Sequence, residues 1–350
     1  YLHAAIYTRL RRPSSGLPLP PGPPSDSICG TSFQSEFFYR HFEKWTQEYG
    51  PVFSFRQGLK TIAAVDIMEK EGAALADRPR SIAAGETLSG GMRVLLTPAG
   101  ERFKKMRSVA SYSPILMKTA RQNMLDIVQD PERHQDHAKR YAAAVVMALA
   151  YGKVPPSYED PEVQSVNRCL TRLGLTMRAG AWRVDIFPLL EFVPGYLKPL
   201  KDGHAEELGL FKSLLHEVRD QIARGDEVPS SFGKYLIERQ EEYQLNDDET
   251  AYLAGSMFGA GSDTTASAIS VAVMAATCYP ETQKKVQEEL DAVIGKDRHA
   301  FDILPQTMAF VLESFRWRPV TSGGFPHKAT RDIIWVCGSF IRSAHKLIIV

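Results

Sequence analysis

The chain has 350 residues, of which 44% are hydrophobic and 24% are charged, and its formal net charge is +1. This composition is typical of a globular protein and excludes a disordered chain. Because 42 basic residues balance 41 acidic ones, there is no bulk positive field, and we expect no nucleic-acid partner. The cysteines are spread without a Cys-x-x-Cys pair, which favours a reducing compartment over a disulfide framework or zinc site: Cys29, Cys169, Cys278 and Cys337.

The N-terminal residues have the order expected beside a membrane anchor. No window reaches the roughly 18 uninterrupted apolar residues that a membrane span requires. An apolar stretch, Tyr1–Tyr7, is followed by arginines within residues 9–12 and by six prolines within Pro13–Pro24. A basic cluster before a stiff, extended linker is typical of the cytoplasmic side of an N-terminal anchor. A frayed, proline-rich terminus is an equally good interpretation of residues 1–30.

Local patterns predict a helix and a hairpin after this linker. Apolar residues recur at steps of 4, 3 and 4 within Gln34–Tyr49, which places them on one face of a helix. Two β-prone runs, Val52–Phe55 and Thr61–Val65, are separated by a glycine-containing turn and predict a hairpin. A capping box that begins at Asp66 predicts another helix. We therefore expect a small sheet near the N-terminus.

The middle of the chain is predicted to be helical. Apolar residues keep a 3,4 rhythm through Leu208–Ile222, and Gly225 ends the run. The prolines and aromatics of Asp185–Pro199 suit a packed loop. The longest predicted helix begins after its cap, Asn246, and continues to Cys278. About 32 residues at 1.5 Å each make this helix roughly 48 Å long, which indicates a central pillar.

The interior of this long helix has many small residues, at Gly255 and through Gly259–Thr265. Each glycine in a helix interior costs about 1 kcal/mol relative to alanine. One interpretation is a bent helix that lines a pocket, with an acid and a hydroxyl, Asp263 and Thr264, at the bend. The other is close packing against a neighbouring helix, with Asp263 merely exposed. Composition alone leaves both interpretations open.

Two more helices are predicted at Glu281–Ile294 and Thr307–Trp317. In the second, Glu313 and Arg316 are spaced i to i+3 and lie side by side. The helix has a separate apolar face that comprises Met308, Val311, Leu312 and Phe315. An exposed pair of this kind contributes only a few tenths of a kcal/mol and identifies no function alone.

Several motifs occur together in a specific order along the chain. They are Gly100–Arg107, Ala260–Thr265 in the long helix, Glu313–Arg316, Arg318-Pro319 and Pro326-His327. This set resembles the cytochrome P-450 family of haem-thiolate monooxygenases over about residues 13–335, most closely its fungal microsomal members. The resemblance implies a mainly α fold with a small β region, which is the cytochrome P-450 fold without its C-terminal quarter.

The resemblance implies roles for residues of the long helix and of the helix that carries the Glu-x-x-Arg motif. Asp263 and Thr264 match the family's acid and alcohol, which relay protons to bound dioxygen. Glu313 and Arg316 match its structural pair, which supports the core and does no chemistry.

The resemblance also implies cofactor-binding residues. Arg107 and His327 match positions that contact haem propionates, where a cation meets a carboxylate. Phe103 stands where the family usually has Trp, which removes an indole donor. Ala260 and Gly261 match the helix segment beside the cofactor. Three further segments resemble substrate-contacting stretches: Ile82–Val94, Phe258–Gly261 and Val320–Phe325.

The family's activity supplies expectations for the whole protein. The resemblance implies haem b iron and insertion of one oxygen atom from O2 into a lipophilic substrate. It also implies electrons from an NADPH-dependent reductase and a monomer at the cytoplasmic face of the endoplasmic reticulum membrane. The N-terminal anchor that would hold it there is absent or nearly absent from the chain.

The chain departs from the family at the haem ligand. The axial cysteine of the family lies in a Phe-x-x-Gly-x-Arg-x-Cys-x-Gly loop well beyond the Glu-x-x-Arg motif. Cys337 lacks that flanking pattern, so we assign no metal ligand. We interpret residues 31–335 as an incomplete cytochrome P-450-like domain and 336–350 as a divergent tail. We therefore expect this polypeptide to bind haem weakly or not at all.

Two alternatives to an active oxygenase follow from the residues. The missing cysteine loop is compatible with a catalytically inactive, truncated fragment or helical binding module. A metal hydrolase built on His134 and His137 lacks the Glu of His-Glu-x-x-His, and a solvated face is the better interpretation of that segment. No nucleophile elbow, phosphate loop or dinucleotide fingerprint occurs in the sequence.

Overall fold

The computed structural model describes residues 19–25, 31, 38–50, 52–57, 60–65, 77–98, 113–155, 157, 159–178, 180–293, 304–321, 324–331, 333–334, 340–341 and 346–348. The chain forms two compact units. The first comprises Tyr1–Arg107, Thr171–Ala205 and Thr321–Val350, and the second comprises Ser108–Leu170 and Glu206–Val320. Helices dominate the described residues and strands are few, which confirms the predicted fold class. The two units are described separately.

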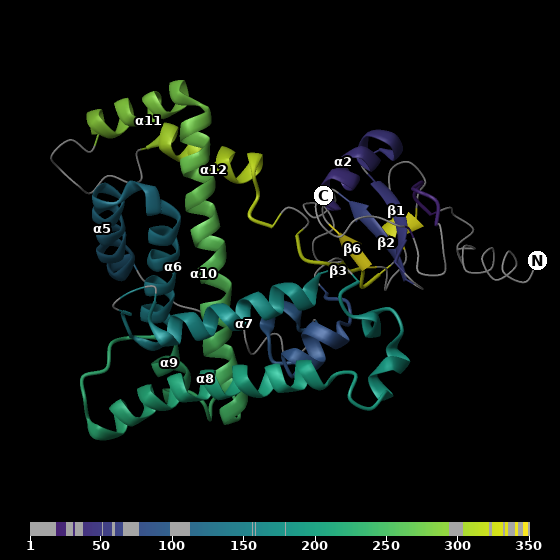
Figure 1. The fold of residues 1–350 in the computed structure, drawn as a ribbon, viewed down its shortest axis with the longest axis horizontal. Helices are drawn as coiled ribbons and strands as arrows, with labels where there is room; N and C mark the ends of the chain where they lie inside the picture. The colour runs from purple at the N-terminus through teal and green to yellow at the C-terminus, as the bar shows by residue number, and fades with distance from the viewer. Residues whose placement is uncertain are drawn as a thin grey trace, which may run out of the picture. The chain divides into compact units, whose positions relative to one another are not determined.

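In the first unit, an aromatic cluster joins a helix to a hairpin. Helix α2 (Phe38–Tyr49) precedes strands β1 (Val52–Gln57) and β2 (Lys60–Val65), which pair antiparallel. Helix α2 lies beside the hairpin (Figure 1), and its buried face packs on β1 through Phe42, Trp45, Phe53 and Phe55. The ring centroids of these four residues lie 5.4–6.5 Å apart, a separation at which aromatic pairs attract each other. The predicted hairpin is confirmed, and the helix expected after Asp66 lies outside the described residues.

The proline-rich segment docks along strand β1. Ser54 donates its backbone N–H to Pro21 O at 2.8 Å and its hydroxyl to Pro20 O at 2.7 Å. At Gly22, an added Cβ would lie 1.8 Å from Ser54 O. Only glycine permits so close an approach of two backbones, so this segment is specified by Gly22 as well as by its prolines.

The chain beyond Trp335 contributes strands to two sheets. The four-stranded sheet has the order β1-β2-β6-β3, with β6 (Lys346–Ile348) parallel to β2 and antiparallel to β3 (His327–Lys328). A second sheet pairs β4 (Ile333–Ile334) with β5 (Phe340–Ile341). Strands β5 and β6 fall within the segment interpreted above as a divergent tail, and β6 lies between two strands of the first sheet.

Short helical turns complete the first unit. They are the π-helix η1 (Ile82–Leu88) and the 3-10 turns η2 (Val94–Leu96), η4 (Arg183–Asp185) and η5 (Pro188–Phe192). Buried Ile82, Leu88, Val184, Leu197 and Leu200 join them in one apolar cluster. The expected packed loop at Asp185–Pro199 is therefore mostly turns.

The second unit is built on α10 (Asp247–Cys278), which spans 32 residues as predicted. The side chain of Asn246 accepts from Glu249 N, and Glu249 returns the bond to Asn246 N, so the predicted cap is confirmed. Helix α6 (His134–Tyr151) packs against α10 (Figure 1). Around this pair lie α5 (Ser113–Gln129), η3 (Pro131–Arg133), α9 (Phe232–Glu238), α11 (Pro280–Val293) and α12 (Pro305–Trp317).

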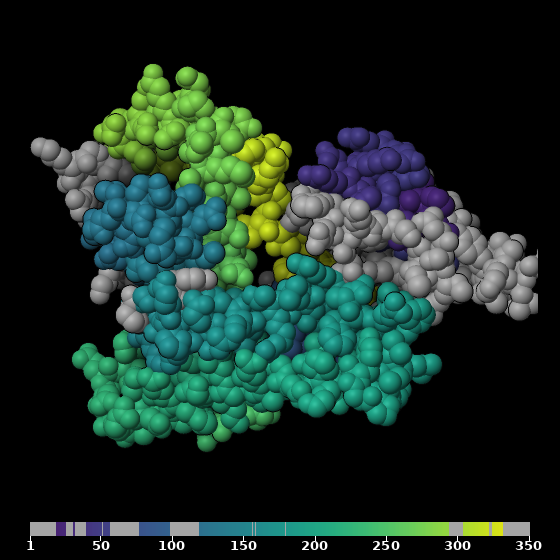
Figure 2. All heavy atoms as spheres, viewed as in Figure 1, coloured from purple at the N-terminus to yellow at the C-terminus, as the bar shows by residue number. Residues whose placement is uncertain are grey.

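Helices α7 (Pro161–Met177) and α8 (Lys198–Arg224) contribute residues to both units. Helix α8 begins ten residues before the predicted start at Leu208. Pro199 lies in its first turn, where a missing N–H costs nothing, so this proline opens the helix instead of excluding it. Pro280 likewise becomes the first residue of α11. Helix α11 has no buried residue and stands at the surface of its unit (Figure 2). No described helix is long and apolar enough to cross a membrane.

Two buried tyrosines of the second unit provide a matched test of its packing. Tyr252 donates its hydroxyl to the buried Glu207 carboxylate at 2.6 Å. The hydroxyl of Tyr151 is buried with no hydrogen-bond partner among the described residues, and burial raises its pKa, so it stays protonated. We expect Tyr252→Phe to lower the free energy of unfolding by about 1–3 kcal/mol, since Glu207 loses a donor. We expect Tyr151→Phe to leave it unchanged or raise it. Urea unfolding of both variants measures the difference, and equal losses would contradict this assignment.

Candidate functional site

Glycines of α10 allow two neighbouring side chains to approach its backbone. A Cβ added at Gly255 would lie 2.3 Å from Cγ of Phe211, and one added at Gly261 would lie 2.6 Å from Cγ2 of Val146. Phe211 comes from α8 and Val146 from α6. For these two glycines the structure supports the interpretation of close helix packing. Helix α10 continues without interruption from Asp247 to Cys278.

The predicted acid and alcohol lie on the exposed face of α10. Ala260, Asp263, Thr264 and Ser267 are exposed and are spaced at i, i+3, i+4 and i+7, so they share one stripe. Thr264 donates its hydroxyl to Ala260 O at 2.6 Å. The Asp263 carboxylate makes no hydrogen bond or ion pair with any other described residue.

This arrangement determines which groups can exchange protons. The Thr264 proton is directed to a helix carbonyl, which leaves its oxygen lone pairs available to accept a hydrogen bond. The Asp263 carboxylate, which has no partner among the described residues, can take a proton from solvent and release it to a neighbouring acceptor. The stripe therefore offers a proton source beside a hydroxyl, with small side chains on either side.

Helix α12 carries the predicted charged pair and an uncovered apolar face. Arg316 donates through Nε and Nη2 to the two carboxylate oxygens of Glu313 at 2.7 and 2.5 Å. The hydrogen bond from Arg316 lowers the pKa of Glu313. Both side chains are exposed, at 73% for Arg316 and 60% for Glu313. The apolar face predicted from the sequence is also exposed: Met308, Val311, Leu312 and Phe315.

In the first unit, His327 lies half-buried at the start of β3 and pairs with Leu347 of β6. Asp77, which is distant in sequence, holds Lys328, the residue after His327. Lys328 donates its N–H to Asp77 O at 2.8 Å, and its Nζ lies 3.0 Å from the Asp77 carboxylate. The strand that carries His327 is thus fixed by contacts outside its own sheet.

Arg78 holds the residues before His327. Its Nη1 donates to Phe325 O at 3.3 Å and to Pro326 O at 3.0 Å. Asp77 and Arg78 were missed by sequence reasoning, because their partners lie about 250 residues away and no local motif marks them. Their effect is to fix the backbone on both sides of the predicted propionate contact.

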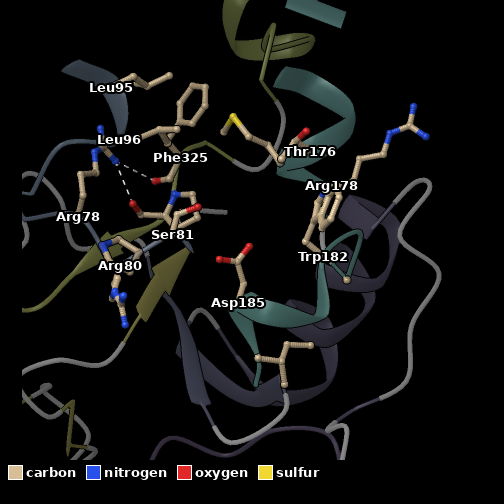
Figure 3. A pocket seen from close by; sticks show the side chains of 15 residues that line it. Arg78, Arg80, Ser81, Leu95, Leu96, Thr176, Arg178, Trp182, Asp185 and Phe325 are labelled. Carbon is tan, nitrogen blue, oxygen red and sulfur yellow. Dashed lines mark hydrogen bonds between the residues drawn. The ribbon is translucent and has the colours of Figure 1, made fainter. Parts of the chain in front are cut away.

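The first unit also contains a cavity of about 110 Å³ (Figure 3). Its walls come from the segments around Arg78–Ser81, Leu95–Leu96, Thr176–Ile186 and Phe325–Pro326. The Asp185 carboxylate points into the space between Ser81 and Trp182 (Figure 3). The cavity borders two segments that the sequence marks as substrate-contacting, the one that begins at Ile82 and the one that ends at Phe325.

Comparison with known proteins identifies the class to which this fold and these motifs belong. The family model "Cytochrome P450" matches residues 20–342. Cytochrome P450 monooxygenase 88 of Postia placenta is 47% identical over 95% of this chain and 72% of its own length. Cytochrome P450 monooxygenase 113 of the same organism is 48% identical over 91% of this chain and 68% of its own length. A cytochrome P450 monooxygenase of Armillaria gallica is 35% identical over 96% and 70%, respectively.

The chain belongs to the cytochrome P450 family, and the recognition made from its motifs is confirmed. It is a member of a monooxygenase family, which implies a haem iron cofactor, O2, a small-molecule substrate and a redox partner. The match continues to residue 342, seven residues past the point where the motifs place the end of the resemblance.

The residues predicted to hold haem are only partly described, and those described lie in different units. His327 and the α10 stripe are present, whereas Phe103 and Arg107 lie outside the described residues, as do Cys29 and Cys337. Cys169 is 2% exposed within α7. Cys278 lies fourteen residues beyond Thr264, or about 21 Å along the helix. Neither cysteine fits an axial ligand beside the stripe, and the described residues form no metal-binding cluster.

Proposed function

We propose that this cytochrome P450 inserts one oxygen atom from O2 into a lipophilic small molecule, using electrons from an NADPH-dependent reductase. The observation that carries the proposal is the exposed pair Asp263 and Thr264 on α10 in a chain of this family, in which the Asp263 carboxylate has no partner among the described residues. In this proposal Asp263 takes protons from solvent, and Thr264 accepts a hydrogen bond through its free lone pairs. Both are groups that general acid catalysis requires within one water of the reacting oxygen.

Other residues have binding roles in this proposal. Ala260 would keep the helix surface low beside haem b, because its side chain is small, whereas Gly261 next to it faces Val146 of α6. His327 offers a cation to a propionate, and Arg107 offers a second one near Phe103. Glu313 and Arg316 act as a structural pair. The apolar walls of the first-unit cavity, which include Leu96, Met177, Trp182 and Phe325, support a lipophilic substrate.

We further propose attachment to the cytoplasmic face of the endoplasmic reticulum membrane, as a monomer. Support comes from the arginines within residues 9–12, which precede the extended proline segment. The described part of that segment contacts β1 through Pro20, Pro21 and Gly22. Docking of the linker would hold the start of the first unit close to an anchor. Fractionation of cells that express the gene tests this, with recovery in the soluble fraction as the contradicting result.

The proposed activity is tested by reconstitution. The purified protein, supplied with haemin, is mixed with NADPH, a microsomal reductase and a panel of lipophilic compounds. We expect an oxidised product that requires NADPH, reductase and air together, and that carbon monoxide suppresses. Product that forms equally without reductase would contradict the proposed electron source. A protein that holds haem yet oxidises nothing on the panel would favour the alternative, a catalytically inactive binding module.

A further inference from the structure

Three arginines and one aspartate line the cavity of the first unit: Arg78, Arg80, Arg178 and Asp185. The arginines differ in how far acidic partners neutralise them. Arg80 donates to both carboxylate oxygens of Glu86, at 2.6 and 2.8 Å, and contacts Glu191 at 3.5 Å. These carboxylates raise the pKa of Arg80. Arg178 is exposed, and its side chain extends away from the cavity (Figure 3). Arg80 is therefore neutralised, and Arg178 does not face the space.

Asp185 is the acidic group that faces the cavity, and backbone donors hold it. Its Oδ1 accepts from Ile82 N at 2.7 Å and from Ala83 N at 3.3 Å, at the start of η1. The carboxylate also interacts electrostatically with Arg80. The backbone donors and Arg80 already stabilise the charge of Asp185. Asp185 therefore does not neutralise Arg78, the remaining arginine of the cavity.

Arg78 is the remaining cation of the cavity wall. Its Nη1 is used on Phe325 O and Pro326 O, whereas Nε and Nη2 have no partner among the described residues. No described carboxylate forms an ion pair with it. Burial lowers the pKa of Arg78, with no compensating contribution from an acid. A half-buried guanidinium with three unused donors favours an incoming anion, because a buried charge without a partner is costly.

The remaining walls combine apolar side chains with the hydroxyl-bearing residues Ser81 and Thr176, and the space is small. Leu96, Met177, Trp182, Ile186 and Phe325 surround a volume of about 110 Å³. An apolar cavity of roughly 150 Å³ holds benzene, so this smaller cavity takes at most a group of about one ring. The ligand that matches both features has a compact apolar body and one anionic end.

We propose that this cavity binds a carboxylic acid, with a ring-sized apolar group between Trp182 and Leu96 and the carboxylate against Nε and Nη2 of Arg78. The planar guanidinium fork matches the two oxygens of a carboxylate. This inference rests on the proposed function, since it assigns the substrate an acidic class within the lipophilic ones. In this proposal, Nη1 of Arg78 holds the Phe325–Pro326 backbone, and Nε and Nη2 bind the ligand.

A series of isosteric ligands tests the proposal without any substitution. Isothermal titration calorimetry measures the binding of benzoate, benzamide and benzylamine to the purified, haem-free 350-residue chain. We expect benzoate to bind ~10-fold more tightly than either analogue, as a charge-assisted hydrogen bond implies. Equal affinities would show that the apolar walls alone decide binding. Preference for benzylamine would show that Asp185 decides it. Either result overturns the proposal.

Two variants then locate the effect. Arg78→Gln keeps a donor for the Phe325 and Pro326 carbonyls but removes the charge, and we expect benzoate affinity to fall ~10-fold while benzamide affinity is unchanged. Arg178→Gln is the matched control, because it removes a lining arginine whose side chain extends away from the cavity, and we expect no loss. A folded Arg78→Gln chain that keeps the benzoate preference would overturn the proposal. If that variant unfolds, the ligand series on the parent chain still decides.

The assay separates this inference from the proposed function. Binding is measured without haem, whereas oxidation requires the haem-loaded protein and reductase. Selective benzoate binding with no oxidation of acids or neutral compounds would overturn the proposed function and leave the acid site in place. Oxidation of neutral lipophiles by a protein with no benzoate preference would overturn the acid site alone.

Discussion

Replacing Asp263 by Asn is expected to lower product formation about 10²-fold, the low end of the range for general acid–base catalysis. The amide cannot release a proton, and the wild-type carboxylate has no other partner among the described residues to which the loss could be attributed. The measurement is product formed per NADPH consumed, with the haem-loaded protein and reductase. We expect NADPH consumption to continue while the product fraction falls.

Variants on the same stripe control this experiment. Ser267→Ala removes an exposed hydroxyl one turn from Asp263, outside the proposed pair, and should leave the product fraction unchanged. Thr264→Val should lower it, because the hydroxyl that bonds Ala260 O is lost. Thr264→Ser should restore most of it. An Asp263→Asn protein with normal coupling would show that protons arrive by another route.

Gly255→Ala is expected to lower the free energy of unfolding by about 1–3 kcal/mol, the usual cost of overpacking a core. The new Cβ would lie 2.3 Å from a ring carbon of Phe211, which is 1% exposed and cannot move aside freely. This cost exceeds the gain of up to about 1 kcal/mol that alanine brings to a helix interior. Urea unfolding of the full chain gives the difference.

Gly209→Ala is the matched control for Gly255→Ala. Gly209 lies in α8 with no atom within 4 Å of an added Cβ. We expect this substitution to stabilise the chain by up to about 1 kcal/mol. Phe211→Leu in the Gly255→Ala background should recover part of the lost stability by removing the ring. Stabilisation by Gly255→Ala alone would show that α8 and α10 are not closely packed at this glycine.

Elements with local signals were predictable from the sequence. The long helix α10 and its capping box follow from Asn246, Glu249 and an uninterrupted helical run. The hairpin follows from two β-prone runs around one short turn. In these cases the partners lie within a few residues of each other, so pattern and propensity determine the outcome.

Contacts between distant residues could not be predicted in this way. Asp185 caps η1 across 103 residues, and Arg78 reaches Pro326 across 248. Strand β6 joins β2 across more than 280 residues, and its three residues have no pattern strong enough to identify a strand. Gly255 was ambiguous for a different reason, because a small residue permits either a ligand or a side chain to approach, and only the position of Phe211 distinguishes them.

The most direct test of the central claim is the origin of the oxygen atom in the product. The haem-loaded protein is supplied with NADPH, reductase and a substrate that it oxidises, under dioxygen labelled with a heavy oxygen isotope. Mass spectrometry of the product should show one labelled oxygen atom, as the proposed insertion from O2 requires. An unlabelled oxidised product would show that the oxygen comes from water and would contradict the account of this chain as a monooxygenase.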